Sequence, residues 1–180
     1  MKIMIASDIH GSLHWCRKML ECFENEKADR LVLLGDLLYH GPRNELPKEY
    51  NPKEVCELLN KYKENLMCVR GNCDCEVDQM ILGFPVMADY ALYAEDNVTL
   101  FITHGHNFNN EKLPPLKKGD FLVHGHTHVP AFDDMGDYTY VNPGSVSIPK
   151  ENSENGYIIF EKGKFLFKNL EGKVYREENC

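Results

Sequence analysis

Long apolar runs and basic clusters are both missing from this sequence of 180 residues. No stretch approaches the roughly 20 apolar residues that cross a bilayer, so we expect no membrane partner. The 28 acidic side chains outnumber the 20 basic ones, which gives a formal charge of −8. A groove for long DNA or RNA depends on many cation–phosphate contacts, so we expect no long nucleic acid as partner. A small phosphate ester stays compatible with this acidity if metal ions supply positive charge locally.

The seven cysteines lack the C-x-x-C pairs of zinc and redox motifs. Their number is odd, so they cannot all pair within the chain, and reduced thiols of the cytoplasm are the expected state. The sequence begins with an apolar stretch that is too short for a signal peptide and is typical of a first strand. Internal repeats and linkers are also missing, which predicts one domain over residues 1–180 and leaves open whether the chain forms a homo-oligomer.

The first half of the sequence alternates between strands and helices. Ser12 is a suitable N-cap for a helix over residues 13–26, and Pro52 suits the first turn of a helix that reaches Lys61. Short apolar runs, typical of buried strands, are found at residues 2–7, 31–34 and 67–69. The pattern predicts right-handed β-α-β units, with sheets in the middle and helices outside.

After Pro85 the pattern changes to successive strands. Residues 90–94 and 98–103 flank a hairpin turn, residues 121–123 form another apolar run, and three further Gly-containing turns follow. We expect these strands to be antiparallel.

Residue types that bind metals follow five of the strands. They are Asp8-Ile9-His10-Gly11, Gly35-Asp36, Gly71-Asn72-Cys73-Asp74, His104-Gly105-His106 and Gly125-His126-Thr127-His128. The Asp-x-His, Gly-Asp and Gly-Asn-Cys-Asp motifs are each common in turns and loop caps, whereas Gly125-His126-Thr127-His128 with the preceding His124 is harder to explain in that way. Ligands of α/β sheets gather at the carboxyl ends of strands, so the five together predict one shared site. A mixed set of imidazole, carboxylate and amide ligands fits two metal ions bridged by one carboxylate.

At these residues the sequence resembles the calcineurin-like metallophosphoesterase superfamily, whose pattern runs D-x-H, G-D, G-N-[HC]-[DE], G-H and G-H-x-H. The stretches at 6–12, 40–44, 70–74 and 142–147 look like the small bacterial YfcE-type phosphodiesterases. The resemblance implies an α/β fold with two β-sheets packed face to face and flanked by helices, the αββα sandwich.

The resemblance also implies a role for each matching residue. Asp8, His10 and His128 would hold one metal ion, Asp36 would bridge both ions, and Asn72, His104 and His126 would complete the second site. A hydroxide between the ions would attack phosphorus, and Asn72 would stabilise the developing charge. Mn²⁺ is the expected ion, with Fe, Zn, Ni and Co as alternatives.

One position departs from the commonest family pattern, which has histidine as the acid for the leaving group where this chain has Cys73. A thiol is a poorer proton donor than an imidazolium at neutral pH, so Cys73 is either a weak acid or a packing residue. His40 and His106 are the other candidate donors. Arg43 and Asn44, in the loop after Asp36, are candidate contacts for a substrate phosphate or anchors of their own loop.

The predicted function is hydrolysis of a phosphodiester, or of another phosphoester with a good leaving group. Cyclic nucleotides, dinucleoside polyphosphates and small diesters all stay open as substrates. The main alternative is a catalytically silent scaffold of the same fold, which tends to lose metal ligands, whereas all seven are present here. A redox or zinc-storage protein would need paired cysteine motifs that are absent.

Overall fold

The computed structural model describes all residues from Met1 to Cys180. It contains three helices and eleven strands in the following order: β1 (Ile3–Ala6), α1 (Leu13–Glu26), β2 (Arg30–Leu33), α2 (Pro52–Asn60), β3 (Leu66–Cys68), α3 (Glu76–Ile81), β4 (Tyr90–Glu95), β5 (Val98–Thr103), β6 (Asp120–Val123), β7 (Ala131–Asp134), β8 (Tyr138–Asn142), β9 (Gly156–Glu161), β10 (Lys164–Asn169) and β11 (Val174–Asn179). None of the helices combines the length and the apolar character of a membrane span.

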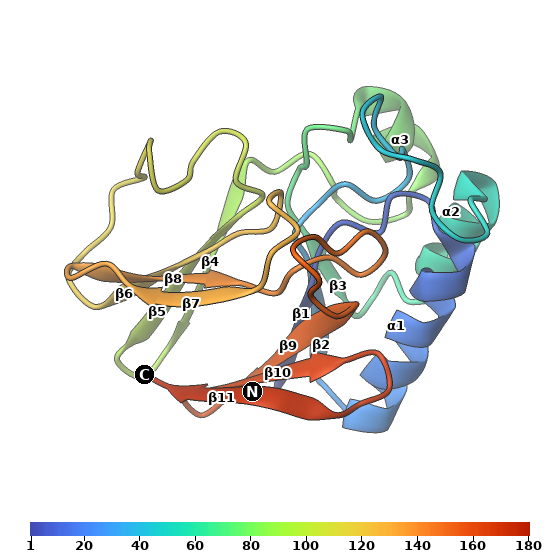
Figure 1. Cartoon of the computed structure of the whole chain (residues 1–180). Helices are drawn as coiled ribbons and strands as arrows, with labels where there is room; N and C mark the ends of the chain where they lie inside the picture. Colours follow the sequence, from blue (N-terminus) through green and yellow to red (C-terminus); the bar gives the residue numbers. More distant parts are fainter.

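The strands form two sheets that pack against each other (Figure 1). The first has the order β11-β10-β9-β1-β2-β3, and the second has the order β4-β5-β6-β8-β7. In the first sheet β1 is parallel to β2 and antiparallel to β9. This arrangement confirms the predicted α/β fold with two packed sheets.

One expectation about the fold needs correction. The strands of the second half are not all antiparallel, because β6 is parallel to both β5 and β8. The long segment 104–119 returns the chain to the end of the sheet where β5 began, which a short hairpin turn cannot do. The helices lie on the outer face of the first sheet (Figure 1). Loop residues, including Phe108 and Leu116, cover part of the outer face of the second sheet.

The side chains of β1 point alternately into the two main parts of the hydrophobic core, which lie on opposite faces of the first sheet. Met4 and Ala6 face the helices, while Ile3 and Ile5 face the second sheet, because successive side chains of a strand point to opposite faces. Helix α1 completes the first part with its buried face, and its N-cap is Ser12, whose side chain accepts a hydrogen bond from the Trp15 N–H. Burial on both faces holds β1 rigidly, so the loop that follows it is well anchored.

Helix α3 was not predicted from the sequence. None of its residues is buried, and its apolar side chains Val77, Met80 and Ile81 are 63%, 82% and 51% exposed. A helix without a buried face has no apolar periodicity that sequence patterns can reveal.

Candidate metal centre

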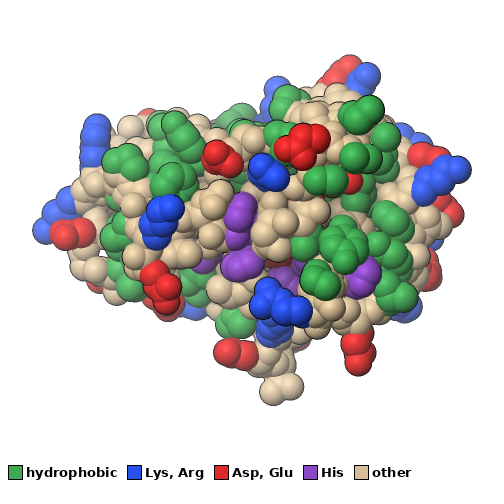
Figure 2. Space-filling view, turned by 90° about the horizontal axis from the view of Figure 1, so that it is seen from above, with side chains coloured by type: hydrophobic (Ala, Val, Ile, Leu, Met, Phe, Trp, Pro, Cys, Tyr) green, Lys and Arg blue, Asp and Glu red, His purple; other side chains and the backbone are tan.

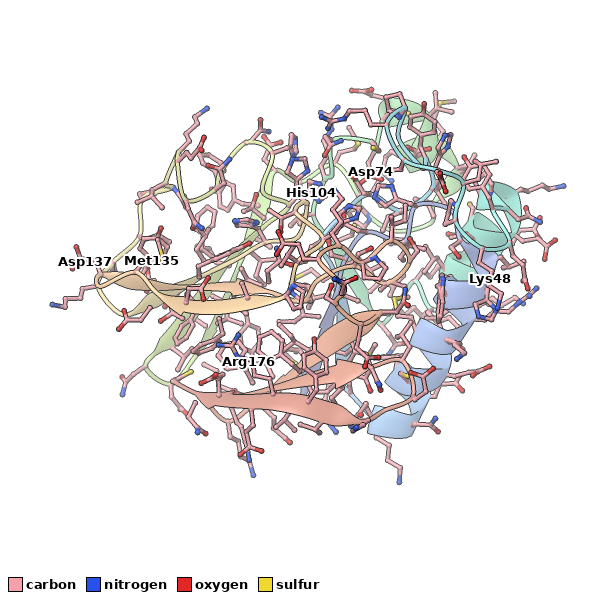
Figure 3. All side chains as sticks on the ribbon, in the orientation of Figure 1. Lys48, Asp74, His104, Met135, Asp137 and Arg176 are labelled. Carbon is pink, nitrogen blue, oxygen red and sulfur yellow. The ribbon has the colours of Figure 1, made fainter.

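The five predicted loops meet at one edge of the two sheets. Asp8 and His10 follow β1, Asp36 follows β2 and Asn72 follows β3, while His104 comes from the second sheet after β5. Figure 3 shows His104 and Asp74 together above the strand ends, and histidine side chains are visible at the centre of the face in Figure 2. The site therefore lies where both sheets contribute loops.

Backbone strain is concentrated in these loops. Asp8, His10, Asp36, His126 and His128 all have φ between 50° and 66°, the left-handed region that side chains other than glycine seldom adopt. Such conformations cost free energy and persist where the surrounding structure holds them, as at functional sites. Here the strain turns each side chain sharply away from the end of its strand and toward the others.

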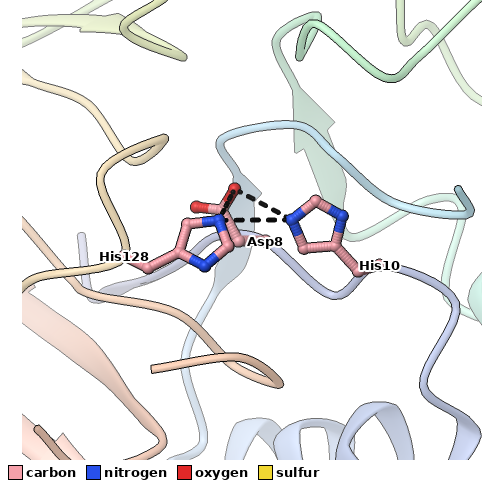
Figure 4. A group of neighbouring side chains, drawn as sticks. All are labelled: Asp8, His10 and His128. Atoms are coloured by element: carbon pink, nitrogen blue, oxygen red, sulfur yellow. Dashed lines mark hydrogen bonds and ion pairs between the residues drawn. The ribbon is translucent and has the colours of Figure 1, made fainter. Parts of the chain in front are cut away.

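The first group of ligands is formed by Asp8, His10 and His128 (Figure 4). Asp8 Oδ1 lies 3.2 Å from His128 Nε2 and 3.5 Å from His10 Nε2, and the two Nε2 atoms are 3.3 Å apart. Burial opposes ionisation of Asp8, but the imidazoles of His10 and His128, when they carry a proton on Nε2, outweigh burial and hold its pKa well below the ordinary value. Asp8 is therefore an anion within a buried triad.

Main-chain carbonyl groups orient three of the imidazole rings. His10 Nδ1 lies 2.8 Å from the Tyr39 oxygen, His128 Nδ1 lies 2.7 Å from the Ile148 oxygen, and His104 Nδ1 lies 2.7 Å from the Leu34 oxygen. A carbonyl oxygen can only accept, so each Nδ1 must donate its N–H. In a neutral ring this leaves the Nε2 lone pair directed into the site, as metal-binding histidines require.

The resulting geometry fits a bound cation. Two Nε2 lone pairs facing each other at 3.3 Å repel each other unless a proton or a cation lies between them. Metal–nitrogen bonds of about 2.0–2.1 Å at a tetrahedral angle separate two ligand nitrogens by about 3.3 Å. In addition, the buried Asp8 Oδ1 accepts no hydrogen bond. The donor set of the first group is thus suited to a metal ion.

A second group surrounds His104. Its Nε2 lies 3.1 Å from Asn72 Oδ1, 3.2 Å from His126 Nδ1 and 3.5 Å from Asp36 Oδ2. The same Asp36 oxygen is 3.7 Å from His10 Nε2 of the first group. Asp36 is therefore positioned between the two groups, where one carboxylate could contact two ions.

Serine side chains support Asp8, two of them from the segment after β8 and one from the residue that precedes Asp8. Ser145 Oγ and Ser147 Oγ donate to the Asp8 carbonyl oxygen at 2.9 and 3.0 Å, and Ser7 Oγ donates to Asp8 Oδ2 at 2.6 Å. The His126 N–H also donates to Oδ2, at 3.1 Å. Sequence reasoning noted residues 142–147 only as part of the resemblance and missed these contacts.

Asp74 holds the Asp36 loop against the loop that carries Asn72. Its carboxylate, which is 2% exposed, accepts hydrogen bonds from the N–H groups of Asp36, Leu37 and Gly71 at 2.8, 2.9 and 2.7 Å. Burial raises the pKa of Asp74, and the bond from the Leu37 N–H opposes that rise. The sequence signal was present in the Gly71–Asp74 motif, but it did not indicate which N–H groups the carboxylate reaches.

A cavity of about 480 Å³ opens beside these groups. Arg43, Asn44 and Cys73 line it, as does Lys150, which sequence reasoning did not select. Burial and the Asp36 carboxylate raise the pKa of Cys73 to about 12, so its thiol keeps its proton at neutral pH.

The two histidines predicted as alternative proton donors do not line this cavity. The His40 ring lies against the rings of Tyr39 and Tyr50, with centroid distances of 4.8 and 5.2 Å. The His106 ring is 5.4 Å from that of His104. Burial and the neighbouring His104 ring lower the pKa of His106.

A sandwich of two mixed sheets, with carboxylate, imidazole and amide ligands converging at the strand ends, defines a metal-dependent phosphoesterase. Comparison with known proteins gives the family. The model of the calcineurin-like phosphoesterase superfamily domain matches residues 1–164, and the chain belongs to this superfamily.

Relatives and a solved structure agree with this assignment. The chain is 50% identical over 157 residues to phosphodiesterase YfcE of Escherichia coli, a match that covers 87% of this chain and 85% of the relative. It is 30% identical over 152 residues to phosphodiesterase MJ0936 of Methanocaldococcus jannaschii, covering 80% and 83%. The solved structure of the Escherichia coli phosphoesterase Yfce has a TM-score of 0.95 at 44% identity and covers 99% of both chains. The family resemblance expected from the motifs is confirmed.

Proposed function

We propose that this chain hydrolyses phosphodiesters, or other phosphoesters with good leaving groups, at a centre of two divalent transition ions. The position of Asp36 carries the proposal, because its Oδ2 lies between His10 and His104 at 3.7 and 3.5 Å. Two relatives that are named phosphodiesterases, at 50% and 30% identity, support the choice of substrate.

Seven side chains would hold the ions. Asp8, His10 and His128 would bind the first, Asn72, His104 and His126 the second, and Asp36 both. The four imidazoles favour transition ions, and the oxygen ligands suit Mn²⁺ among them. When bound, two such ions generate a nucleophile from water at neutral pH and stabilise both the attacking and the leaving oxygens.

The remaining residues of the site would bind the diester and determine which leaving groups can depart. Arg43 and Asn44 line the cavity and can contact phosphate oxygens. Cys73, with a pKa of about 12, is a weak proton donor at neutral pH. His106, with its lowered pKa, is neutral there and is therefore a poor proton donor. Substrates whose leaving group departs with little protonation should therefore react best.

The scaffold alternative is not favoured, because all seven candidate ligands are present and lie in mutual contact. For the compartment we propose the cytoplasm, which is supported by seven cysteines that all remain free thiols. The organisation as a single domain over residues 1–180 stays a prediction.

Removal and return of metal tests the proposal. We expect a chelator to abolish hydrolysis of an aryl phosphodiester, and Mn²⁺ to restore it better than Mg²⁺, which prefers nearly complete oxygen coordination. Calorimetric titration of the stripped protein should give a binding ratio near two Mn²⁺ per chain. Equal reactivation by Mg²⁺ would contradict direct coordination by the imidazoles.

A further inference from the structure

Two basic side chains stand on different walls of the cavity beside the metal centre. Arg43 belongs to the loop after Asp36, which packs on the Cys73 side of the site, since a Cβ added at Gly41 would lie 3.4 Å from Cys73 Sγ. Lys150 comes from the segment after β8, on the side of His128. Basic side chains flank the histidines on the face shown in Figure 2.

The main chain of Lys150 is tied to the metal-binding wall. Its N–H donates to the His128 carbonyl oxygen at 3.1 Å, and its own carbonyl oxygen accepts from Ser153 N–H and Oγ at 3.0 and 2.6 Å. The neighbouring Ile148 carbonyl accepts from His128 Nδ1 at 2.7 Å. These bonds hold the base of the Lys150 side chain in place, while the side chain itself is exposed.

Neither of these two basic side chains has an ion-pair or hydrogen-bond partner within the protein. Arg43 and Lys150 take part in none of the ion pairs of the structure, and their side chains donate no hydrogen bond. Both are thus free to bind an anion in the cavity. This is notable in a chain of net charge −8, where acidic side chains are the commoner neighbours.

The charges of the centre are already balanced without Lys150. Two divalent ions would bring four positive charges, which the carboxylates of Asp8 and Asp36, one diester phosphate and one anionic nucleophile offset. The charge of Asp74 is taken up by three backbone N–H groups. During attack the charge of the nucleophile passes to the phosphoryl group, so this balance does not change, and Arg43 can donate hydrogen bonds to the phosphoryl oxygens. The positive charge of Lys150 is not needed for this balance and is left for a further anion.

We propose that Lys150 determines specificity by binding a second phosphate group of the substrate. The inference rests on the proposed phosphodiesterase function and narrows its substrate class to diesters that carry an additional phosphate. The cavity volume of about 480 Å³ lies within the range of sites that hold a whole small ligand, so it exceeds the needs of one phosphate. A cyclic nucleotide, with its single negative charge, would leave Lys150 without a partner.

A matched pair of substrates tests this role. One is the 5′-(4-nitrophenyl) phosphodiester of thymidine, and the other is the same compound with a 3′-phosphate, so the bond that breaks and the leaving group are identical. We expect the Mn²⁺ enzyme to show a higher kcat/KM for the compound with the second phosphate. Lys150→Gln should lower that kcat/KM about tenfold, which is typical for loss of a hydrogen bond between charged groups, and should leave the simple diester nearly unchanged.

Two further variants serve as controls. Lys150→Arg keeps the charge and should retain the preference for the second phosphate. Lys118→Gln removes an exposed lysine that does not line the cavity, so it should change neither substrate. Metal content should be wild-type in all three variants, because Lys150 contacts His128 through its main chain only.

The outcomes separate this proposal from the proposed function. An equal loss on both substrates in Lys150→Gln, or no preference in the wild-type enzyme, would overturn the role of Lys150 and leave the phosphodiesterase function standing. If neither diester is hydrolysed, binding of thymidine 3′,5′-bisphosphate and thymidine 5′-monophosphate decides. Tighter binding of the bisphosphate that disappears in Lys150→Gln would support the role of Lys150 even though the function had failed, and equal binding of both would refute it.

Discussion

The Asp74 carboxylate joins the loop that carries Asp36 to the loop that carries Asn72, and we call this arrangement the Asp74 clamp. Its removal is the most direct test of how the loops of the metal centre are held together. One carboxylate oxygen, Oδ2, accepts from the N–H groups of Asp36 and Gly71, and the other, Oδ1, accepts from Leu37. In Asp74→Asn, one oxygen becomes an NH₂ group that cannot accept. At least one buried N–H then faces a donor, whichever way the amide turns.

The expected cost follows from these contacts. A hydrogen bond to a charged group contributes about 1.5–3 kcal/mol, and a buried donor left without a partner costs about 1–3 kcal/mol. We therefore expect Asp74→Asn to lower the free energy of unfolding by about 3 kcal/mol. For a chain of this length that corresponds to a fall in Tm of roughly 6–12 °C.

Thermal unfolding of the metal-free protein is the assay, since bound metal would add its own stabilisation. The matched control is Asp137→Asn, because Asp137 is an exposed aspartate in the turn between β7 and β8, far from Asp74 in Figure 3. Calorimetry should in addition show Mn²⁺ affinity weakened by about tenfold or more, as for other residues that orient metal ligands. A Tm within a degree or two of the control would refute the clamp.

Three other predictions follow from the site. Asp36→Ala should abolish turnover and lower the metal content. Arg43→Ala should cost at most about 1.5–3 kcal/mol of transition-state stabilisation, measured as kcat/KM. Wild-type turnover in Asp36→Ala would mean that Asp36 does not bridge the two metal ions. Cys73→His should accelerate hydrolysis of esters with alkyl leaving groups more than that of esters with aryl ones. The reason is that general acid assistance of roughly 10²–10⁴-fold applies only where proton transfer limits the rate. If kcat/KM of the wild-type enzyme does not depend on leaving-group pKa, a proton donor already exists. Burial lowers the pKa of His124 from 6.5 in the unfolded chain to about 4 in the folded protein. Between pH 6.5 and pH 4 the imidazole of His124 is therefore protonated in the unfolded chain but neutral in the folded protein. The free energy of unfolding consequently falls as the pH drops through this range. The metal-free protein should lose about 2 kcal/mol between pH 7 and pH 5 relative to His124→Gln in urea titrations, and equal losses in both proteins would contradict the shift.

Local patterns in the sequence were enough to predict most of the individual elements. The helix over residues 13–26 follows from the Ser12 cap and from apolar residues at helical spacing, and it has those bounds in the structure. The hairpin of β4 and β5 follows from two apolar runs around a short turn. The identity of the candidate ligands could also be predicted, because each is a polar residue in the loop that follows a short apolar strand.

Pairing between distant strands lay beyond those patterns. A short apolar strand can be buried beside parallel or antiparallel strands. The apolar run in β6 therefore does not reveal that β5 and β8 are both parallel to it. The exposed helix α3 had no apolar face to detect. The one-sided helix layer depends likewise on which sheet the helices cover, and that is decided by the packing of the whole chain.

The orientation of the ligands was decided by the tertiary structure alone. Every residue has a carbonyl group, and nothing local marks those of Leu34, Tyr39 and Ile148 as the ones that accept from His104, His10 and His128. The same holds for Lys150, one of many lysines until the chain folds and its main chain meets His128. The sequence by itself determined which chemical groups are available, because these are properties of single residues. Only the fold decided which lone pairs and charges face one another, because contacts across more than a hundred residues of chain depend on the packing of both sheets.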